Sequence, residues 1–149
     1  MHPFPHRYVV TAVAGTEAEI LLESDGVPAL RTTLPAEFGG PGDRWSPETL
    51  LVAAVGDCFA LTFRGIASRS KLDWTSLVCD VVGTLDRVER VTRFVQFDIQ
   101  ARLQIPEETN AEEARRLLAK AEETCLISRS LSAVTHLQTV VETVVTQVA

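Results

Sequence analysis

The stretch that decides the fold is SPETLLVAAVGDCFALTFRGIASRSK, residues 46–71. It begins with a helix-start pattern, in which Ser46 is the expected N-cap, Pro47 takes the first helical position and Glu48 lies in the first turn. The apolar run that follows has no clear polar face until near its end. Because a helix that is apolar on all sides belongs inside a protein, we expect a buried central helix with one thiol, Cys58, at its midpoint.

The composition indicates one globular domain over residues 1–149, since 149 residues with 46% hydrophobic side chains can bury a substantial core. The net charge of −6 argues against nucleic acid or an anionic membrane surface as the main partner. No apolar run reaches the roughly 20 residues of a membrane span, and the start MHPFPHRYVV does not resemble a signal peptide, so we expect a cytoplasmic protein. Three scattered cysteines and three histidines, without a Cys-x-x-Cys pair, argue against a disulfide framework and a structural zinc site.

The rest of the chain predicts an α+β fold in the order β-β-β-α-β-β-α-(α)-β. The clearest strand, residues 91–105, is apolar at almost every second position, which predicts one buried and one wet face and an antiparallel hairpin with the strand before it. The other expected elements are strands at 7–13, 17–24, 27–34, 74–86 and 135–148, a glycine-rich loop at 35–45, a helix that Thr109 or Asn110 caps, and a short helical piece after Cys125.

The three cysteines differ in their surroundings. Cys79 lies within an expected strand and is interpreted as a packing residue, as most free cysteines are. Cys58 follows Asp57, whose charge disfavours a thiolate, so the residues alone leave open whether Cys58 is reactive or only buried. Cys125 ends one helix and precedes the next, where free N–H groups favour a thiolate. If Cys58 and Cys125 meet, one can form a sulfenic acid with a peroxide and the other can condense with it to a disulfide.

Two motifs resemble the OsmC/Ohr family, named for osmotically induced and organic hydroperoxide resistance proteins. They are SPExLLxAAxxxCF at residues 46–59 and KAxxxCxxS at residues 120–128. The order of strands and helices matches as well, so the similarity covers nearly the whole chain. The resemblance implies an intertwined homodimer in which antiparallel sheets wrap around two central helices, with two active sites at the interface.

The activity that the resemblance implies is a thiol-dependent peroxidase that reduces organic hydroperoxides. By this analogy Cys58 is the peroxidatic cysteine and Cys125 the resolving cysteine. Glu48 is the acid that orients an arginine, and the arginine steadies the Cys58 thiolate. A dithiol such as a lipoylated protein recycles the enzyme, without a bound metal or flavin.

The first departure from the family pattern is that the arginine is missing from its usual positions. The places where the family usually carries it, residues 14–17 and Phe38 here, hold none. Arg44, four residues before Glu48, is the expected substitute, and Arg31 is the second choice. An exposed arginine in a glycine-rich loop can equally be a solvated side chain.

Two further departures concern the thiols and leave a second function open. Asp57 replaces a small neutral residue and would tend to raise the pKa of the neighbouring thiol. Leu126 replaces a proline that often follows the second cysteine. The alternative is therefore a non-catalytic dimer of the same fold that binds a small apolar ligand or senses oxidation. A purely structural dimer with buried thiols is a third interpretation.

Overall fold

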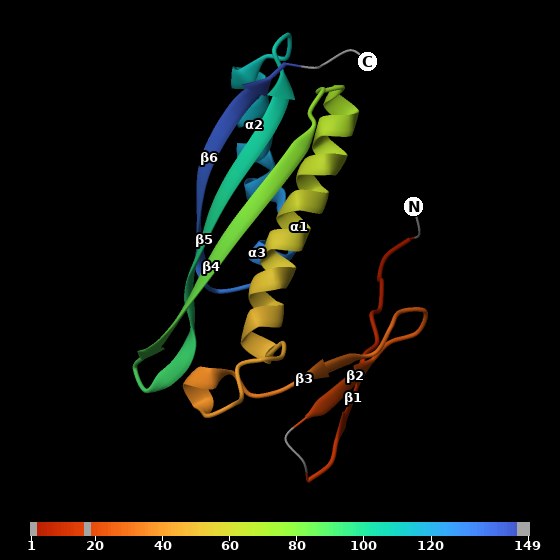
Figure 1. Cartoon of the computed structure of the whole chain (residues 1–149), viewed down its shortest axis with the longest axis vertical. Helices are drawn as coiled ribbons and strands as arrows, with labels where there is room; N and C mark the ends of the chain where they lie inside the picture. The colour runs from red at the N-terminus through yellow and green to blue at the C-terminus, as the bar shows by residue number, and fades with distance from the viewer. Residues whose placement is uncertain (1–2, 17–18, 146–149) are drawn as a thin grey trace. The chain divides into compact units, whose positions relative to one another are not determined.

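The computed structural model describes residues 3–16 and 19–145, and their contacts divide the chain into two compact units, Met1–Leu51 and Val52–Ala149. The assignment of residues 1–149 to one domain stays a prediction. The first unit contains β1 (Thr11–Ala14), β2 (Ile20–Glu23), β3 (Leu30–Thr32) and the 3-10 turn η1 (Ala36–Phe38), and α1 (Pro47–Ser70) runs from it into the second (Figure 1). The second unit continues with β4 (Ser76–Val88), β5 (Val91–Pro106), α2 (Ala111–Thr124), α3 (Leu126–Arg129) and β6 (Val134–Val144).

The first sheet is antiparallel in the order β1-β2-β3, as expected, but its strands are shorter than the sequence predicts. Pro28 lacks an N–H for the ladder, and β3 begins only at Leu30. Residues 17 and 18, at the start of the second expected strand, lie outside the described residues. The loop after β3 is closed by the Thr33 N–H, which donates to the Trp45 carbonyl at 2.9 Å.

The second sheet has the order β4-β5-β6 and is mixed. β4 and β5 form the predicted antiparallel hairpin, and its turn residues Glu89 and Arg90 both have positive φ, at 50° and 69°, as a tight hairpin turn of this twist requires. β6 runs parallel to β5, whereas antiparallel sheets were expected. The helices α2 and α3 carry the chain back before β6 begins, and such a crossover is what a parallel neighbour needs. The end of the expected last strand, residues 146–148, lies outside the described part.

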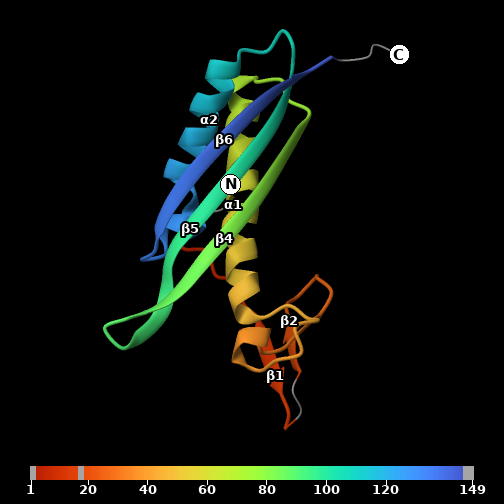
Figure 2. The ribbon, with the colours of Figure 1, turned by 60° about the vertical axis from the view of Figure 1, so that its left-hand side comes forward.

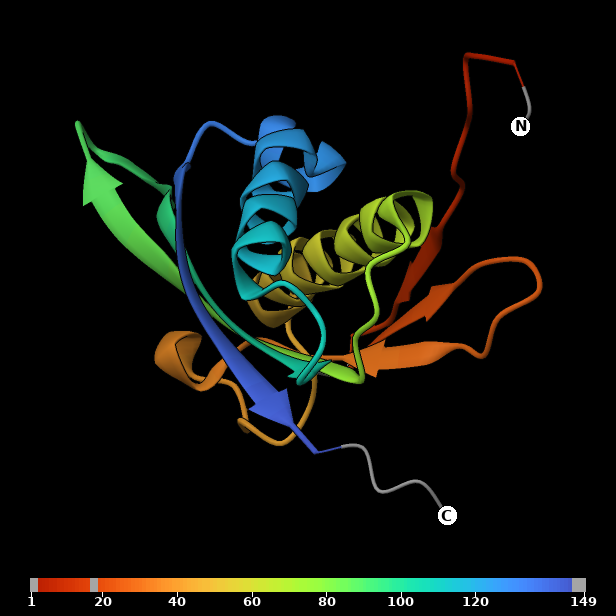
Figure 3. The ribbon, with the colours of Figure 1, turned by 90° about the horizontal axis from the view of Figure 1, so that it is seen from above.

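The core of the second unit lies where α1 and α2 pack on one face of this sheet, α1 along β4 and α2 along β6 (Figure 2 and Figure 3). The predicted alternation of β5 is confirmed over its second half. α1 approaches β4 closely at Gly83, where a Cβ would lie 2.6 Å from the Val52 side chain. The largest fully buried side chains are Val55, Phe59 and Phe63 of α1, Phe97, Ile99, Leu103 and Ile105 of β5, and Leu117 and Leu118 of α2.

The start of α1 follows the predicted pattern. The Thr49 N–H donates to Ser46 Oγ at 3.2 Å, and the Ser46 N–H donates to Thr49 Oγ1 at 2.8 Å. This reciprocal pair is the arrangement of a capping box, with a threonine in place of the usual acid. It fixes the point at which the loop ends and the helix begins.

The whole of α1 is long and apolar enough to meet the criterion for a membrane span, which no single apolar run of the sequence reaches. By length and composition it is able to cross a membrane, because its few charges do not outweigh its apolar side chains. The core helix of a soluble protein meets the same criterion, and α1 contributes Phe59 and Phe63 to the core. Only 28% of its most apolar stretch is fully buried within the single chain, however, and most of its other residues are half-buried.

Candidate functional site

The second unit brings Cys58 and Cys125 together. Cys58 lies at the middle of α1, and Cys125 is the fully buried residue between α2 and α3. The two sulfur atoms lie close enough for each thiol to affect the pKa of the other. The Ile127 N–H, in the first turn of α3, donates to Cys58 Sγ at 3.5 Å. Folding thus unites two thiols whose proximity the sequence spacing alone leaves open.

The surroundings of Cys58 favour a thiolate. Burial raises the pKa of the Cys58 thiol, but the hydrogen-bond donors around the sulfur outweigh burial, and the pKa is lowered from its ordinary value. Two of these donors are backbone amides in the first turn of α3. The first N–H groups of a helix have no hydrogen-bond partner within it, so they are able to donate to an anion. The donors are, in order of effect, the Ile127 N–H, the Cys125 thiol, the Thr62 hydroxyl at 4.0 Å and the Leu126 N–H.

Cys125 has the opposite character. Burial raises the pKa of its thiol, and the neighbouring Cys58 sulfur raises it further. The Ser128 hydroxyl donates to Cys125 Sγ at 3.3 Å, and this hydroxyl and the Ser128 N–H lower the pKa, but not enough to offset burial. The pair is therefore unequal: Cys58 ionises first, and Cys125 retains its proton. A nucleophile beside a protonated second thiol is the arrangement that forms a disulfide after the first sulfur is oxidised.

Cys79 does not belong to this pair. It lies on β4, where burial and the adjacent Asp80 raise the pKa of its thiol to about 11. A thiol with that pKa is protonated near neutral pH and is a poor nucleophile. The prediction that Cys79 is a packing residue agrees with this environment.

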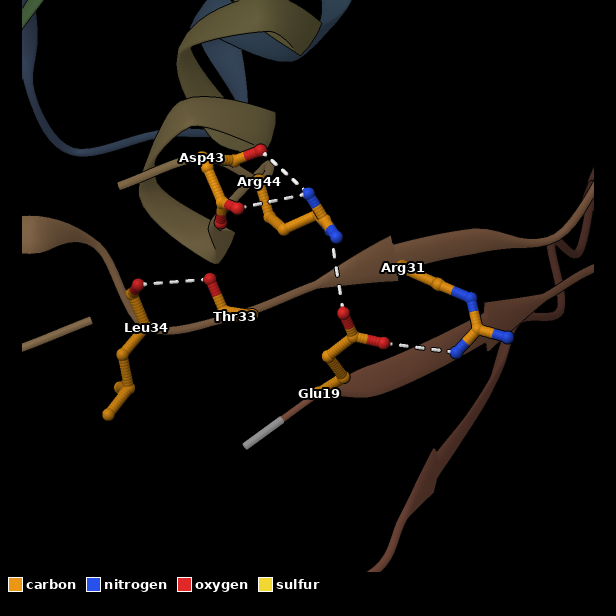
Figure 4. A network of polar contacts seen from close by, with 6 residues as sticks. All are labelled: Glu19, Arg31, Thr33, Leu34, Asp43 and Arg44. Atoms are coloured by element: carbon orange, nitrogen blue, oxygen red, sulfur yellow. Dashed lines mark hydrogen bonds and ion pairs between the residues drawn. The ribbon is translucent and has the colours of Figure 1, made fainter. Parts of the chain in front are cut away.

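The predicted arginines lie in the first unit, in a network around Glu19 (Figure 4). Arg31 Nη1 lies 3.0 Å from Glu19 Oε2, Arg44 Nε lies 3.4 Å from Glu19 Oε1, and Arg44 Nη1 lies 3.2 Å from Asp43 Oδ2. Within the described residues, neither arginine makes a hydrogen bond or ion pair with Glu48. The Glu48 Oε2 atom is buried there without a hydrogen-bond partner. The structure unites the two predicted thiols but does not join the predicted arginine to the predicted acid.

A family model described as OsmC-like protein matches residues 40–140, a range that contains both thiols, α1 and all of the second sheet except the end of β6. The chain belongs to the OsmC-like protein family. This OsmC-like protein is 23% identical over 136 residues to the uncharacterized Bacillus subtilis protein YmaD, and the match covers 89% of this chain and 91% of YmaD.

Solved structures share the fold. An OsmC-like protein of unknown function from Vibrio cholerae superimposes with a TM-score of 0.84 at 15% identity, over 91% of this chain and 100% of the other. An organic hydroperoxide resistance protein from Legionella pneumophila superimposes with a TM-score of 0.70 at 24% identity, over 94% of this chain and 99% of the other. At these identities the likeness shows the fold, whereas function depends on the residues of the site.

Three residues that contact the sulfurs of this OsmC-like protein were not predicted to have a role of their own. Thr62 lies one helical turn after Cys58, so the i, i+4 spacing was a usable signal. Ser128 is the last residue of the second motif. Ile127 acts through its backbone N–H, and no side-chain pattern can reveal such a role. Among residues 3–16 and 19–145, no three His, Cys, Asp or Glu side chains cluster as a metal site would require.

Proposed function

We propose that this OsmC-like protein is a thiol peroxidase that reduces organic hydroperoxides, with Cys58 as nucleophile and Cys125 as resolving thiol. The observation that carries the proposal is the placement of the two thiols: the Ile127 N–H donates to Cys58 Sγ at 3.5 Å, and Cys125, two residues before Ile127, accepts from the Ser128 hydroxyl at 3.3 Å. The fold is shared with proteins whose names record organic hydroperoxide resistance, which supports the substrate class.

The reaction follows from the chemistry of the two sulfurs. The Cys58 thiolate attacks the terminal oxygen of the hydroperoxide, the O–O bond breaks, and the alkoxide takes a proton and leaves as an alcohol. Cys58 is then a sulfenic acid. The Cys125 sulfur attacks the Cys58 sulfur, the S–S bond forms, and the sulfenic oxygen leaves as water. An external dithiol, for which we propose a lipoylated protein, reduces the disulfide by exchange and is itself oxidised.

Glu48 and Arg44 are proposed to assist the thiolate. A buried carboxylate oxygen without a donor is costly, and Glu48 Oε2 is such an atom. Arg44, four residues earlier, is the guanidinium proposed to satisfy it after leaving Glu19, and Arg31 is the alternative. By analogy with the family, the oriented guanidinium then stabilises the anionic sulfur of Cys58.

The active form is proposed to be a cytoplasmic homodimer in which long strands wrap around two central helices. Two observations support a second copy. α1 is apolar, yet only 28% of its most apolar stretch is buried within one chain. Large apolar side chains of the first unit are also exposed, among them Tyr8 and Val9.

The test is peroxide consumption by the reduced protein. Cumene hydroperoxide and hydrogen peroxide are supplied in turn, with dithiothreitol or dihydrolipoamide as the reductant. We expect faster loss of the organic peroxide and a Cys58–Cys125 disulfide in the mass spectrum. The Cys58→Ser variant is expected to fall to the background rate, and Cys79→Ser serves as the matched control that keeps full activity. Turnover that persists in Cys58→Ser would overturn the proposal.

One observation favours the alternative of a non-catalytic ligand-binding or redox-sensing dimer. A hollow of about 880 Å³ in the first unit is lined by Arg31, Arg44 and Trp45, among other residues. Both guanidinium groups are paired with carboxylates, and Leu21, Leu30 and the Trp45 indole also line the hollow. Such a lining suits a small apolar or aromatic molecule. A ligand that remains bound in native mass spectrometry, together with thiols that do not react with either peroxide, would favour this function.

A further inference from the structure

Thr62 presents its hydroxyl to Cys58 from the same helix. It lies one helical turn after Cys58 on α1, so the two side chains are neighbours on the helix surface. Thr62 Oγ1 lies 4.0 Å from Cys58 Sγ, and the Thr62 side chain is half-buried. This distance is at the long end for a hydrogen bond to sulfur, and hydrogen bonds in catalytic sites often tighten when the reacting state forms.

The direction of this hydroxyl is not the usual one for a threonine inside a helix. A helical threonine commonly donates to the backbone carbonyl four residues earlier, as Thr124 does to the Lys120 carbonyl at 2.7 Å. For Thr62 that carbonyl belongs to Cys58. Within the part of the chain that the structure describes, however, the hydroxyl of Thr62 bonds to the sulfur of Cys58 and not to its carbonyl. The hydroxyl is therefore available to the reacting atom.

Few titratable groups of the second unit surround Cys58. The side chains of β5 and α2 that are buried in the core are apolar, whereas β4 contributes Cys79 on its α1-facing side and the α2–α3 junction contributes Cys125. The pKa of each of these thiols is raised, so both are neutral near pH 7. On α1 itself the nearest charged residues are Asp57 and Arg64. A neutral donor beside the sulfur therefore has a distinct role.

We propose that Thr62 is a further catalytic residue, whose hydroxyl donates to the Cys58 sulfur when that sulfur is an anion and sets the pH range in which Cys58 reacts. A thiolate carries no proton, so Thr62 is the donor in this state. A hydrogen bond to an ion is stronger than one to a neutral thiol, and the contact therefore favours the thiolate. The Ile127 N–H donates to the same sulfur from α3. The proposal rests on the proposed function, in which Cys58 is the nucleophile.

A donor of this kind has two opposing effects on the rate at which Cys58 reacts. It increases the fraction of Cys58 that is ionised, but it makes each thiolate less nucleophilic, because nucleophilicity falls as the pKa of a thiol falls. Below the pKa the first effect is the larger one. Above the pKa every Cys58 is ionised and only the second effect remains. Loss of the hydroxyl should therefore slow Cys58 at low pH and accelerate it at high pH.

The test is the pH dependence of thiol–disulfide exchange between Cys58 and dithiodipyridine, from about pH 5 to pH 10. Thr62→Val keeps the shape of the side chain and removes the hydroxyl, and it is compared with Thr62 in a Cys79→Ser background. Loss of one hydrogen bond should reduce the thiolate fraction about fivefold below the pKa. The exchange rate is expected to be about twofold lower there and about twofold higher on the alkaline plateau, so the two pH profiles cross.

Two further variants serve as controls. Thr62→Ser retains a hydroxyl and is expected to restore the original profile. Ser68→Ala removes an exposed hydroxyl from the same helix and should leave the profile unchanged. If Thr62→Val does not fold, Thr62→Ala takes its place in the comparison with Thr62→Ser.

Three outcomes would overturn the proposal. They are profiles that coincide with and without the hydroxyl, profiles that differ by the same factor at every pH, which a change in packing explains, and a Thr62→Ser variant that behaves as Thr62→Val does. No peroxide enters this measurement. Crossing profiles in a protein that fails to reduce peroxides would therefore support the role of Thr62 while contradicting the peroxidase function.

Discussion

At the residue scale, the difference between the two thiols comes from a few hydrogen-bond donors. The first turn of α3 offers the Leu126 and Ile127 amides to Cys58, whereas the Ser128 hydroxyl serves Cys125. Neutral donors of the second unit therefore favour the Cys58 thiolate. In the proposed mechanism, Ser128 is the side chain expected to adjust the resolving step, since its hydroxyl donates to Cys125.

Ser128→Ala is expected to slow disulfide formation. Loss of a hydrogen bond worth about 1 kcal/mol raises the pKa of Cys125 further and reduces its thiolate fraction about fivefold. The Cys58 sulfenic acid should live correspondingly longer, which trapping by dimedone after a single addition of peroxide measures. Ser130→Ala is the control, because that hydroxyl donates to the Leu126 carbonyl and touches neither sulfur. An unchanged sulfenic acid lifetime in Ser128→Ala would contradict this role.

The sequence predicted the identity of the two thiols but not their environment. Cys58 and Cys125 stand in motifs, and a motif preserves side-chain identity. The amide of Ile127 is present in any residue, and its direction is set by where α3 begins. The expected arginine partner of Glu48 was not found, because which guanidinium reaches a carboxylate depends on tertiary geometry, and here Glu19 holds both candidates.

At the element scale, patterns that depend on a single strand or helix were predicted well. The alternation of β5 identified its buried face, and the cap of α2 is Asn110, whose Oδ1 accepts from the Glu112 and Glu113 amides. The direction of β6 was not predictable in the same way. A strand has the same alternation of side chains whether its neighbour is parallel or antiparallel, so only the crossover through α2 and α3 decides it.

Gly83→Ala tests the contact between β4 and α1. The added Cβ would lie 2.6 Å from the Val52 side chain and 2.9 Å from that of Phe94, so packed neighbours must move. We expect a loss of about 1–3 kcal/mol in the free energy of unfolding, measured by urea denaturation. Thr84→Ala, at the next and exposed position, is the control and should change that free energy by less than about 0.5 kcal/mol. Equal stability of the two variants would show that α1 does not approach β4 this closely.

At the scale of the whole molecule, the buried thiols make stability depend on alkaline pH. The pKa of Cys79 is raised to about 11, so the folded state keeps this proton after the unfolded chain has lost it. The unfolded state then binds fewer protons, and stability falls as pH rises from roughly 8.5 toward 11. Below this window the thiol is protonated in both states and has no such effect.

The corresponding prediction concerns Cys79→Ala. Urea denaturation at pH 8 and pH 10 should show a smaller loss of stability with rising pH in this variant than in the wild type. Its baseline stability is expected to be lower because the side chain is truncated, so the change with pH is the quantity to compare. Cys125 is present in both proteins and contributes a loss of the same sign to each. If stability falls equally with pH in the two proteins, Cys79 is not the group whose deprotonation lowers stability at alkaline pH.

The parallel pairing of β6 has a consequence for how the chain is made. β4 and β5 are joined by a tight turn and are able to pair soon after both have been synthesised. The other edge of β5 pairs only with Val134–Val144, which are synthesised later because α2 and α3 come between β5 and β6 in the chain. Until then, that edge presents unpaired amides and carbonyls to any neighbouring nascent chain. On a crowded polysome, β6 therefore competes with other copies of the protein for the same row of hydrogen bonds.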